Sequence, residues 1–302
     1  MLFNTSASPK VSIIISTYNG EKYIAETIAS IREQTYSNWE LVIVDDGSED
    51  NTCEIITGIK DKRIQLHKAG RIGINGRIKN IALSKTTGEL IAFIDHDDLW
   101  TSSKLEKQVA ALQAHPEAGF CLTGGYNFKA KGEPLEYFYQ QREGIRHGRI
   151  FLPIFHSEIA PWTQALLVRK QCIDEAGIFS EAGRFADPEF IFRLACYFNA
   201  VILYEPLMYH RLHDTNYTIV NWEASHEEGI DIIRSYQRKK MLPAAIASNV
   251  LFRSYMHFGE KCLRYKKSGK AANSFFNAWK NKPLSIIPLK KIAKTILFHL
   301  TK

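Results

Sequence analysis

The sequence is poor in cysteine and has neither a long apolar run nor a low-complexity segment. Its five cysteines are widely spaced and form no C-x-x-C pair, which excludes a cysteine zinc or redox motif and favours a reducing compartment. No run of about 18 apolar residues is present, and the first ten residues lack the apolar core of a signal peptide. We therefore expect a cytoplasmic protein without a membrane span.

Positive charge is in excess but unevenly distributed. The 302 residues carry a formal net charge of +7, which suggests an anionic partner: nucleic acid, a membrane surface or a phosphorylated ligand. Residues 251–302 hold 12 Lys and Arg and one acid, so the rest of the chain is mildly acidic. No zinc, helix-turn-helix or RNA-binding aromatic signature accompanies the charge, and we expect no nucleic-acid partner.

The first hundred residues alternate between buried-strand and amphipathic-helix patterns. Largely apolar runs predict buried parallel strands at 11–16 and 40–44, and the recurring pattern predicts further strands at 63–67 and 90–94. Helical spacing predicts helices at 21–34, 50–59 and 74–84. This order predicts an α/β fold of Rossmann-like type with a mostly parallel central sheet.

The remainder is less regular. We expect a helix at 104–114, an irregular stretch at 119–157 with a basic segment at 142–149, a strand at 165–168, a helix at 188–198 and a strand at 201–204. From about residue 221 the pattern is entirely helical, so we predict one domain over 1–220 and a basic helical extension over 221–302.

Polar residues follow three of the predicted strands, reading STYNG at 16–20, DDGS at 45–48 and DHDD at 95–98. In open α/β sheets, ligands bind outside the carboxyl ends of the strands. Each segment alone is also typical of a turn or a helix cap. Together they bring five carboxylates to one edge, an arrangement that needs a cation to offset the repulsion.

The segment at 95–98 is the most informative of the three. Asp95 and Asp97 alternate along an extended chain, so both can reach one hard divalent cation while Asp98 lies beside it. Ligation by oxygen alone suits Mg²⁺ or Mn²⁺ holding a diphosphate and does not suit zinc.

The ordered segments VSIIISTYNG, ELVIVDDGSEDNT and GELIAFIDHDDLW resemble the family 2 glycosyltransferases of the GT-A fold, over roughly residues 10–218. The resemblance implies an inverting enzyme that transfers a sugar from a nucleotide diphosphate sugar, commonly a UDP-sugar, to an acceptor hydroxyl. It implies a nucleotide-sugar half at about 1–100, an acceptor half at 101–220 and a role in bacterial surface polysaccharide or lipopolysaccharide synthesis.

The same resemblance assigns the strand-end residues to the donor. Thr17 and Tyr18 would pack against the base, Asp46 would hydrogen-bond it, Asp95 would bind ribose, and Asp97 would bind the metal. The donor-binding set predicted at these ends is Thr17, Tyr18, Asn19, Asp45, Asp46, Asp95 and His96.

A cation near the diphosphate is expected on charge grounds. The family often has Ala-Arg-Asn where this chain has Ile78-Lys79-Asn80, so Lys79 takes the Arg position and Arg77 is an alternative. Glycines at 70, 73 and 76 do not indicate a dinucleotide site, because that fingerprint belongs directly after the first strand.

Four further assignments complete the predicted site. Asp187 is the candidate general base, although its place before Pro188 also suits a helix N-cap, and both roles are compatible. By resemblance, His213 would reach the metal or the diphosphate. Trp162 could stack on an acceptor sugar or be a core aromatic, and Asp98 is a second candidate acceptor contact.

Two rival functions and two roles for the extension remain open. A sugar nucleotidyltransferase would show a Gly-rich loop and a basic pair after the first strand, and a non-catalytic sugar or nucleotide-binding module would not need Asp187 or His213. The last helix suits either peripheral contact with an anionic membrane, and with it a lipid-linked acceptor, or packing on the domain with a solvated basic face. Its apolar positions are Leu289, Ile292, Ile296, Leu297 and Leu300, with Lys290, Lys291 and Lys294 mostly elsewhere.

Overall fold

The computed structural model describes residues 2–3, 6–129, 136–137, 143–182 and 186–300. The chain forms two compact units, Met1–His213 and Asp214–Lys302. The division falls seven residues before the domain boundary that the helical pattern suggested, because the last sheet strand ends shortly before residue 213.

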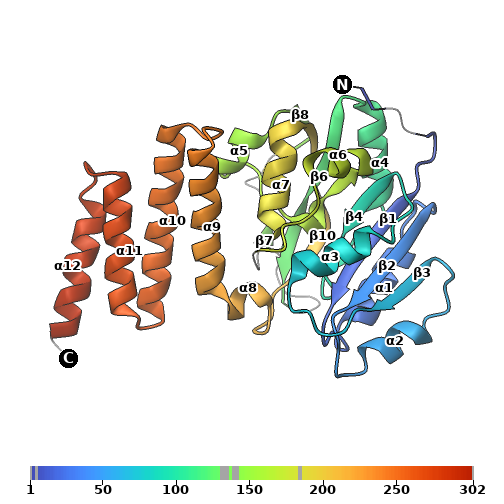
Figure 1. Ribbon diagram of the computed structural model, residues 1–302, viewed down its shortest axis with the longest axis horizontal. Helices are drawn as coiled ribbons and strands as arrows, with labels where there is room; N and C mark the ends of the chain where they lie inside the picture. Colours follow the sequence, from blue (N-terminus) through green and yellow to red (C-terminus); the bar gives the residue numbers. More distant parts are fainter. Residues whose placement is uncertain (1, 4–5, 130–135, 138–142, 183–185, 301–302) are drawn as a thin grey trace. The chain divides into compact units, whose positions relative to one another are not determined.

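The first unit is built on one mixed sheet whose strand order is β3-β2-β1-β4-β9-β6-β10-β5 (Figure 1). The first four strands are parallel, β9 runs antiparallel to both of its neighbours, and β6 and β10 are again parallel. Their bounds are β3 Ile64–Lys68, β2 Trp39–Asp45, β1 Val11–Thr17, β4 Leu90–Phe93, β9 Leu167–Arg169, β6 Ala118–Phe128, β10 Asn199–Arg211 and β5 Leu99–Trp100. The predicted α/β fold with a mostly parallel sheet is confirmed.

Helices and short edge strands complete this unit. In α1 the predicted apolar residues Ile24, Ile28 and Ile31 are all buried, as the helical spacing requires. The remaining elements are α1 Ile24–Arg32, α2 Thr52–Gly58, α3 Asn75–Leu83, α4 Lys104–Ala114, β7 Glu136–Tyr137, β8 Ile145–Gly148, α5 Phe151–Phe155, the 3-10 turn η1 Thr163–Ala165, α6 Lys170–Ala176 and α7 Ala186–Tyr197.

The stretch expected to be irregular contains the eleven-residue strand β6. Its pattern is obscured by Gly124 and Gly125, which are poor strand formers. The structure explains why residue 124 is a glycine, because a Cβ atom there would lie 2.7 Å from the hydroxyl of Tyr137 on the neighbouring β7. Residues 130–135 and 138–142 of the same stretch, Arg142 included, lie outside the described residues.

The second unit is helical, with α8 Tyr217–Val220 followed by four longer helices, α9 Trp222–Arg238, α10 Ala244–Arg264, α11 Ser268–Asn281 and α12 Ile287–Leu300. These four helices pack one against the next along the chain (Figure 1). A small core of Trp222, Phe258, Cys262, Ala271 and Phe275 lies between them. Across the described residues, no helix combines the length and the apolar character needed to cross a bilayer.

Glu40 holds the start of the parallel sheet together. Its carboxylate accepts hydrogen bonds from Lys10 Nζ (2.6 Å), Ser12 Oγ (2.6 Å) and the amide of Thr87 (2.7 Å), and so joins β2 to β1 and to the turn before β4. Burial alone would raise the pKa of Glu40, but these donors outweigh it and lower the pKa to about 2.

We expect Glu40→Gln to reduce the free energy of unfolding by roughly 2 kcal/mol at pH 7. Because folding lowers this pKa from 4.5, the stabilisation is present above about pH 4.5 and is lost as the pH falls toward 2. Urea denaturation should therefore show the variant converging on the wild type in acid, while Glu54→Gln on an exposed helix surface has little effect at either pH. A difference independent of pH would contradict this account.

Candidate active site

Three carboxylates crowd the end of β4. Single oxygen atoms of Asp95, Asp97 and Asp98 all lie within 4.8 Å of one another. Burial raises the pKa of Asp95 to about 6, with Lys79 opposing the shift and Asp97 and Asp187 adding to it. Burial and the charges of Asp97 and Asp95 also raise the pKa of Asp98 well above its usual range. Such a cluster favours a bound cation.

His213, predicted to reach the metal or the diphosphate, lies beside this cluster. Its Nε2 lies 2.9 Å from Asp97 Oδ2, although the two residues are 116 positions apart. Its ring also packs on Tyr23, with the centroids 5.1 Å apart. The oxygens of Asp95, Asp97 and Asp98 form a donor set that fits Mg²⁺ or Mn²⁺, and Asp98 Oδ2 is buried with no hydrogen-bond partner among the described residues.

Arg211, at the end of β10, positions the carboxylate cluster. It was not identified as a site residue from the sequence. Its amide donates to Asp98 Oδ1 at 2.9 Å, and its Nε donates to the carbonyl oxygen of Asp97 at 2.8 Å. A further guanidinium nitrogen, Nη2, lies 2.6 Å from Glu26 on α1. Asp98 has no exposed surface, and its Oδ1 is engaged by the amide of Arg211, while its assignment as an acceptor contact stays a prediction.

The candidate base, Asp187, lies in the first turn of α7, one residue after the helix begins, rather than at a cap before it. Lys79 Nζ donates to both of its oxygens, at 2.7 and 2.6 Å, and Thr163 Oγ1 donates to Oδ2 at 3.0 Å. Lys79 is only 2% exposed. The structure therefore pairs the residue predicted to contact the diphosphate with the residue predicted to be the base.

The segment before β9 joins the base to the carboxylate cluster. Thr163 hydrogen-bonds Asp187, and Nε2 of the next residue, Gln164, donates to Asp95 Oδ2. Trp162 packs on His210 with ring centroids 4.7 Å apart and is partly buried. Sequence reasoning singled out only Trp162 here. The sequence feature that could have identified Thr163 and Gln164 is their place as a polar pair directly before an apolar strand.

Arg71, a second missed residue, lies at the expected base-binding wall. Its guanidinium stacks 3.9 Å from the ring centroid of Tyr18 and forms an ion pair with Asp46. Asp46 Oδ1 also accepts from the amide of Ile72 (2.6 Å), and its Oδ2 accepts from the amide of Gly73 (3.0 Å). Asp46 therefore fastens the loop between β3 and α3 beside Tyr18.

Two of the predicted donor contacts, Asn19 and Asp45, are engaged within the protein, and a third, Thr17, is buried. The amide of Asn19 donates to Ser48 Oγ (2.9 Å), and its Oδ1 accepts from the amide of Glu49 (2.9 Å). Asp45 Oδ2 accepts from the amide of Ser48 at 3.0 Å. Thr17 is buried, and its hydroxyl has no partner among the described residues.

The two remaining predicted donor contacts, His96 and Arg77, lie in different surroundings. The carbonyl oxygen of His96 accepts from Thr27 Oγ1 at 2.9 Å, which fixes the backbone beside the carboxylates. Arg77 is exposed on α3 and forms no ion pair within the described ranges, so it is the cation of this segment that remains available to an anion.

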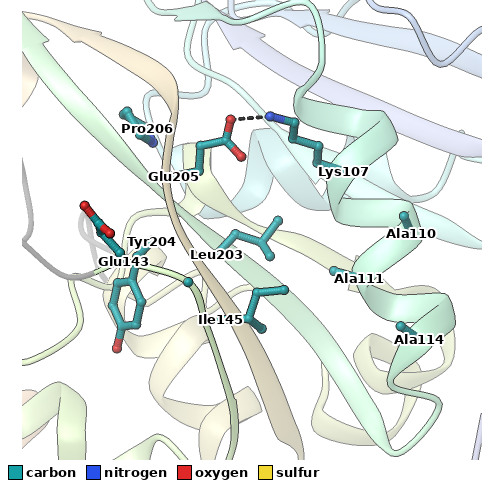
Figure 2. Close-up of a pocket in the computed structure, with 11 residues that line it drawn as sticks. Lys107, Ala110, Ala111, Ala114, Glu143, Ile145, Leu203, Tyr204, Glu205 and Pro206 are labelled. Atoms are coloured by element: carbon teal, nitrogen blue, oxygen red, sulfur yellow. Dashed lines mark hydrogen bonds and ion pairs between the residues drawn. The ribbon is translucent and has the colours of Figure 1, made fainter.

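A cavity of about 700 Å³ lies away from these residues, between α4, β8 and β10. Figure 2 shows Leu203, Ile145 and the alanines of α4 lining it, with the ion pair between Lys107 and Glu205 on one side. None of the predicted site residues lines this cavity.

Comparison with known proteins agrees with this geometry. The family model described as glycosyl transferase family 2 matches residues 12–169, just over half of the chain. The sheet, the carboxylates after β4 and the helical extension define a GT-A type transferase fold. The chain belongs to glycosyl transferase family 2.

Among curated relatives, it is 42% identical over 106 residues to the Escherichia coli UDP-Glc:alpha-D-GlcNAc-diphosphoundecaprenol beta-1,3-glucosyltransferase WfgD, covering 34% of this chain and 40% of that protein. The first curated relatives are matched over 40% to 66% of their own length.

Among solved structures, it resembles S. aureus TarS in complex with UDP-GlcNAc, with a TM-score of 0.67, 18% identity and coverage of 95% of this chain and 89% of that one. It also resembles the mannosyltransferase PcManGT from Pyrobaculum calidifontis in complex with GDP-Man and Mn²⁺, with a TM-score of 0.59, 18% identity and coverage of 99% and 84%.

We expect Asp97→Asn to weaken Mn²⁺ binding, measured by calorimetry in the presence of UDP, by at least about tenfold, because one anionic ligand is lost. Asp231→Asn, on an exposed position of α9, is the matched control and should bind Mn²⁺ like the wild type. Equal affinities in Asp97→Asn and the wild type would exclude this cluster as the metal site.

Proposed function

We propose that the protein is an inverting glycosyltransferase that transfers a sugar from a nucleotide diphosphate sugar to an acceptor hydroxyl. The observation that carries this proposal is the link between the two halves of the site. Adjacent residues, Thr163 and Gln164, hydrogen-bond the candidate base Asp187 and the carboxylate Asp95. A base is thus fixed beside a cluster suited to a metal-bound diphosphate.

In the proposed reaction, Asp187 takes the proton of the acceptor hydroxyl as that oxygen attacks the anomeric carbon from the face opposite the diphosphate. Asp187 lies in the first turn of α7, and Lys79 Nζ donates to both of its carboxylate oxygens. Asp95, Asp97 and His213 would hold Mg²⁺ or Mn²⁺, which when bound neutralises charge on the leaving diphosphate. Arg77, which is exposed on α3, would assist from the protein side.

The comparisons support a nucleotide-sugar donor and favour a UDP-sugar. WfgD is named for UDP-Glc, TarS was solved with UDP-GlcNAc, and PcManGT was solved with GDP-Man. WfgD is also named for a diphosphoundecaprenol acceptor, which supports a lipid-linked glycan acceptor and a role in bacterial surface polysaccharide synthesis. The family match disfavours a sugar nucleotidyltransferase, and the fixed base disfavours a non-catalytic binding module.

We expect Asp187→Asn to lower the transfer rate by about 10²- to 10⁴-fold, because the amide cannot accept the proton. Donor affinity, measured with UDP, GDP and dTDP sugars in the presence of Mn²⁺, should stay within about threefold of the wild type, since substrate binding does not need that proton transfer. The control is Asp174→Asn, which lies on an exposed surface of α6.

The outcomes of that experiment separate the alternatives. Undiminished transfer in Asp187→Asn would remove Asp187 from the role of base. Donor binding without release of diphosphate by the wild type, with any acceptor or with water, would instead support the binding module.

Exposed apolar and basic residues in the helical extension support a proposed contact with an anionic membrane. Leu284, Ile286, Ile287 and Leu289 are exposed at the start of α12, with Lys282 and Lys290 also exposed. Other parts of α12 pack within the unit, since Ile292 contacts the Trp222 core and Lys291 Nζ lies 2.8 Å from Glu260. The side chains of residues 296–300 lie outside the described part. We propose that the exposed apolar surface at 284–289 contacts lipid.

We expect the triple variant Ile286→Ser, Ile287→Ser, Leu289→Ser to bind anionic phosphatidylglycerol vesicles at least about tenfold more weakly in a flotation assay, because it removes most of the exposed apolar area. Val220→Ser, which is similarly exposed on α8, should bind the vesicles like the wild type. Equal vesicle binding by the triple variant would contradict the proposed membrane contact, and hydrolysis of soluble donor should be unaffected in all variants.

A further inference from the structure

A second cluster of metal-ligating side chains lies outside the active site. One ligand atom from each of His115, Glu117 and His147 lies within 4.8 Å of the other two. His115 follows the last residue of α4, Glu117 precedes β6, and His147 belongs to β8. We refer to these three residues as the His-Glu-His cluster.

The cluster is assembled by two separate pieces of chain. At the α4–β6 turn, the amide of Ala118 donates to the carbonyl oxygen of His115 at 2.9 Å, which holds His115 and Glu117 close together. His147 arrives from the other direction, since β8 pairs antiparallel with β10 and places His147 opposite Val201. The His115 and His147 rings stack with centroids 4.6 Å apart at an interplanar angle of 27°.

The spacing matches what a tetrahedral metal requires. Zinc binds imidazole nitrogen and carboxylate oxygen at about 2.0–2.2 Å, so neighbouring ligand atoms lie about 3.3–3.5 Å apart. Here Nδ1 of His115 lies 3.2 Å from Glu117 Oε1, and Nδ1 of His147 lies 3.9 Å from the same oxygen. The longer of these two distances belongs to His147, whose side chain is 60% exposed and whose ring stacks on His115.

The charge of the cluster also suits a cation. A hydrogen bond from its own amide lowers the pKa of Glu117, burial opposes the shift, and both histidines add to it, so the carboxylate is ionised at neutral pH. The nearby guanidinium of Arg169, which interacts electrostatically with Glu117, is committed to the carbonyl oxygens of Ala118 and Leu112 at 2.9 and 2.7 Å.

We propose that His115, Glu117 and His147 form a zinc site distinct from the active-site carboxylates, with the fourth coordination position open to water. Two imidazoles and one carboxylate are the borderline donors that zinc prefers, whereas Asp95, Asp97 and Asp98 offer hard oxygens suited to Mg²⁺ or Mn²⁺. A metal here would fasten the edge strand β8 to the α4–β6 turn, and binding to the folded state alone would stabilise this unit.

The test is a calorimetric titration of the full chain with Zn²⁺. We expect a site that is weakened by at least about 100-fold in His147→Ala and in Glu117→Gln, because each removes a ligand. His156→Ala, an exposed histidine after α5, and Asp97→Asn, at the active site, should leave that site intact. Saturating Zn²⁺ should raise the melting temperature of the wild type and not that of His147→Ala.

Cobalt distinguishes the two kinds of site by its spectrum, because tetrahedral Co²⁺ absorbs visible light much more strongly than six-coordinate Co²⁺ in an oxygen site. We expect an intense visible band that Asp97→Asn retains and His147→Ala loses. Equal Zn²⁺ affinity in the wild type, His147→Ala and Glu117→Gln, or a Co²⁺ spectrum that depends only on Asp97, would overturn the proposal. His147→Ala should keep its Mn²⁺-dependent transfer activity in either case.

Discussion

The site depends on the balance of charge at the carboxyl edge of the sheet. Parallel packing of β1, β2 and β4 necessarily brings the strand ends together, and with them Asp45, Asp46, Asp95, Asp97 and Asp98. Unpaired carboxylates at this density would repel one another and resist burial. The structure offsets them with cations delivered from elsewhere in the chain, and those pairings determine which groups remain available to a substrate.

Each cation comes from a different element. Arg71 in the loop after β3 pairs with Asp46, Lys79 on α3 pairs with Asp187, and Arg211 at the end of β10 holds the Asp97–Asp98 backbone and side chain. Because Lys79 is buried against the candidate base Asp187, the diphosphate expected at this site has to be bound by other groups. A metal at Asp97 and the exposed Arg77 are the groups suited to that task. This division of roles is consistent with the net charge of the two parts of the chain. The catalytic unit is mildly acidic, and the net positive charge lies in the helical extension.

The local pattern predicted much of this fold because each prediction rested on short-range geometry. The run at 11–16 is mostly apolar because both faces of β1 are covered, and the strand is buried from Val11 to Ile15. The same reasoning failed for β6, where Gly124 and Gly125 interrupt the strand pattern and the compensating contact comes from Tyr137 on another strand. A contact of that kind leaves no periodic trace in the sequence.

The amino-acid sequence alone was sufficient to predict the α/β class and the three polar strand ends, and it singled out Asp97, His213 and Asp187 as candidate functional groups. These follow from residue types at fixed distances after apolar strands, and from the motif order that marks the family. Only the tertiary structure decided that Lys79 faces Asp187, 108 positions away, and that Thr163 and Gln164 bridge the base to Asp95. Helix and strand periodicity constrains neighbours a few residues apart, whereas these pairings arise where separate elements pack, so no local pattern could have specified them.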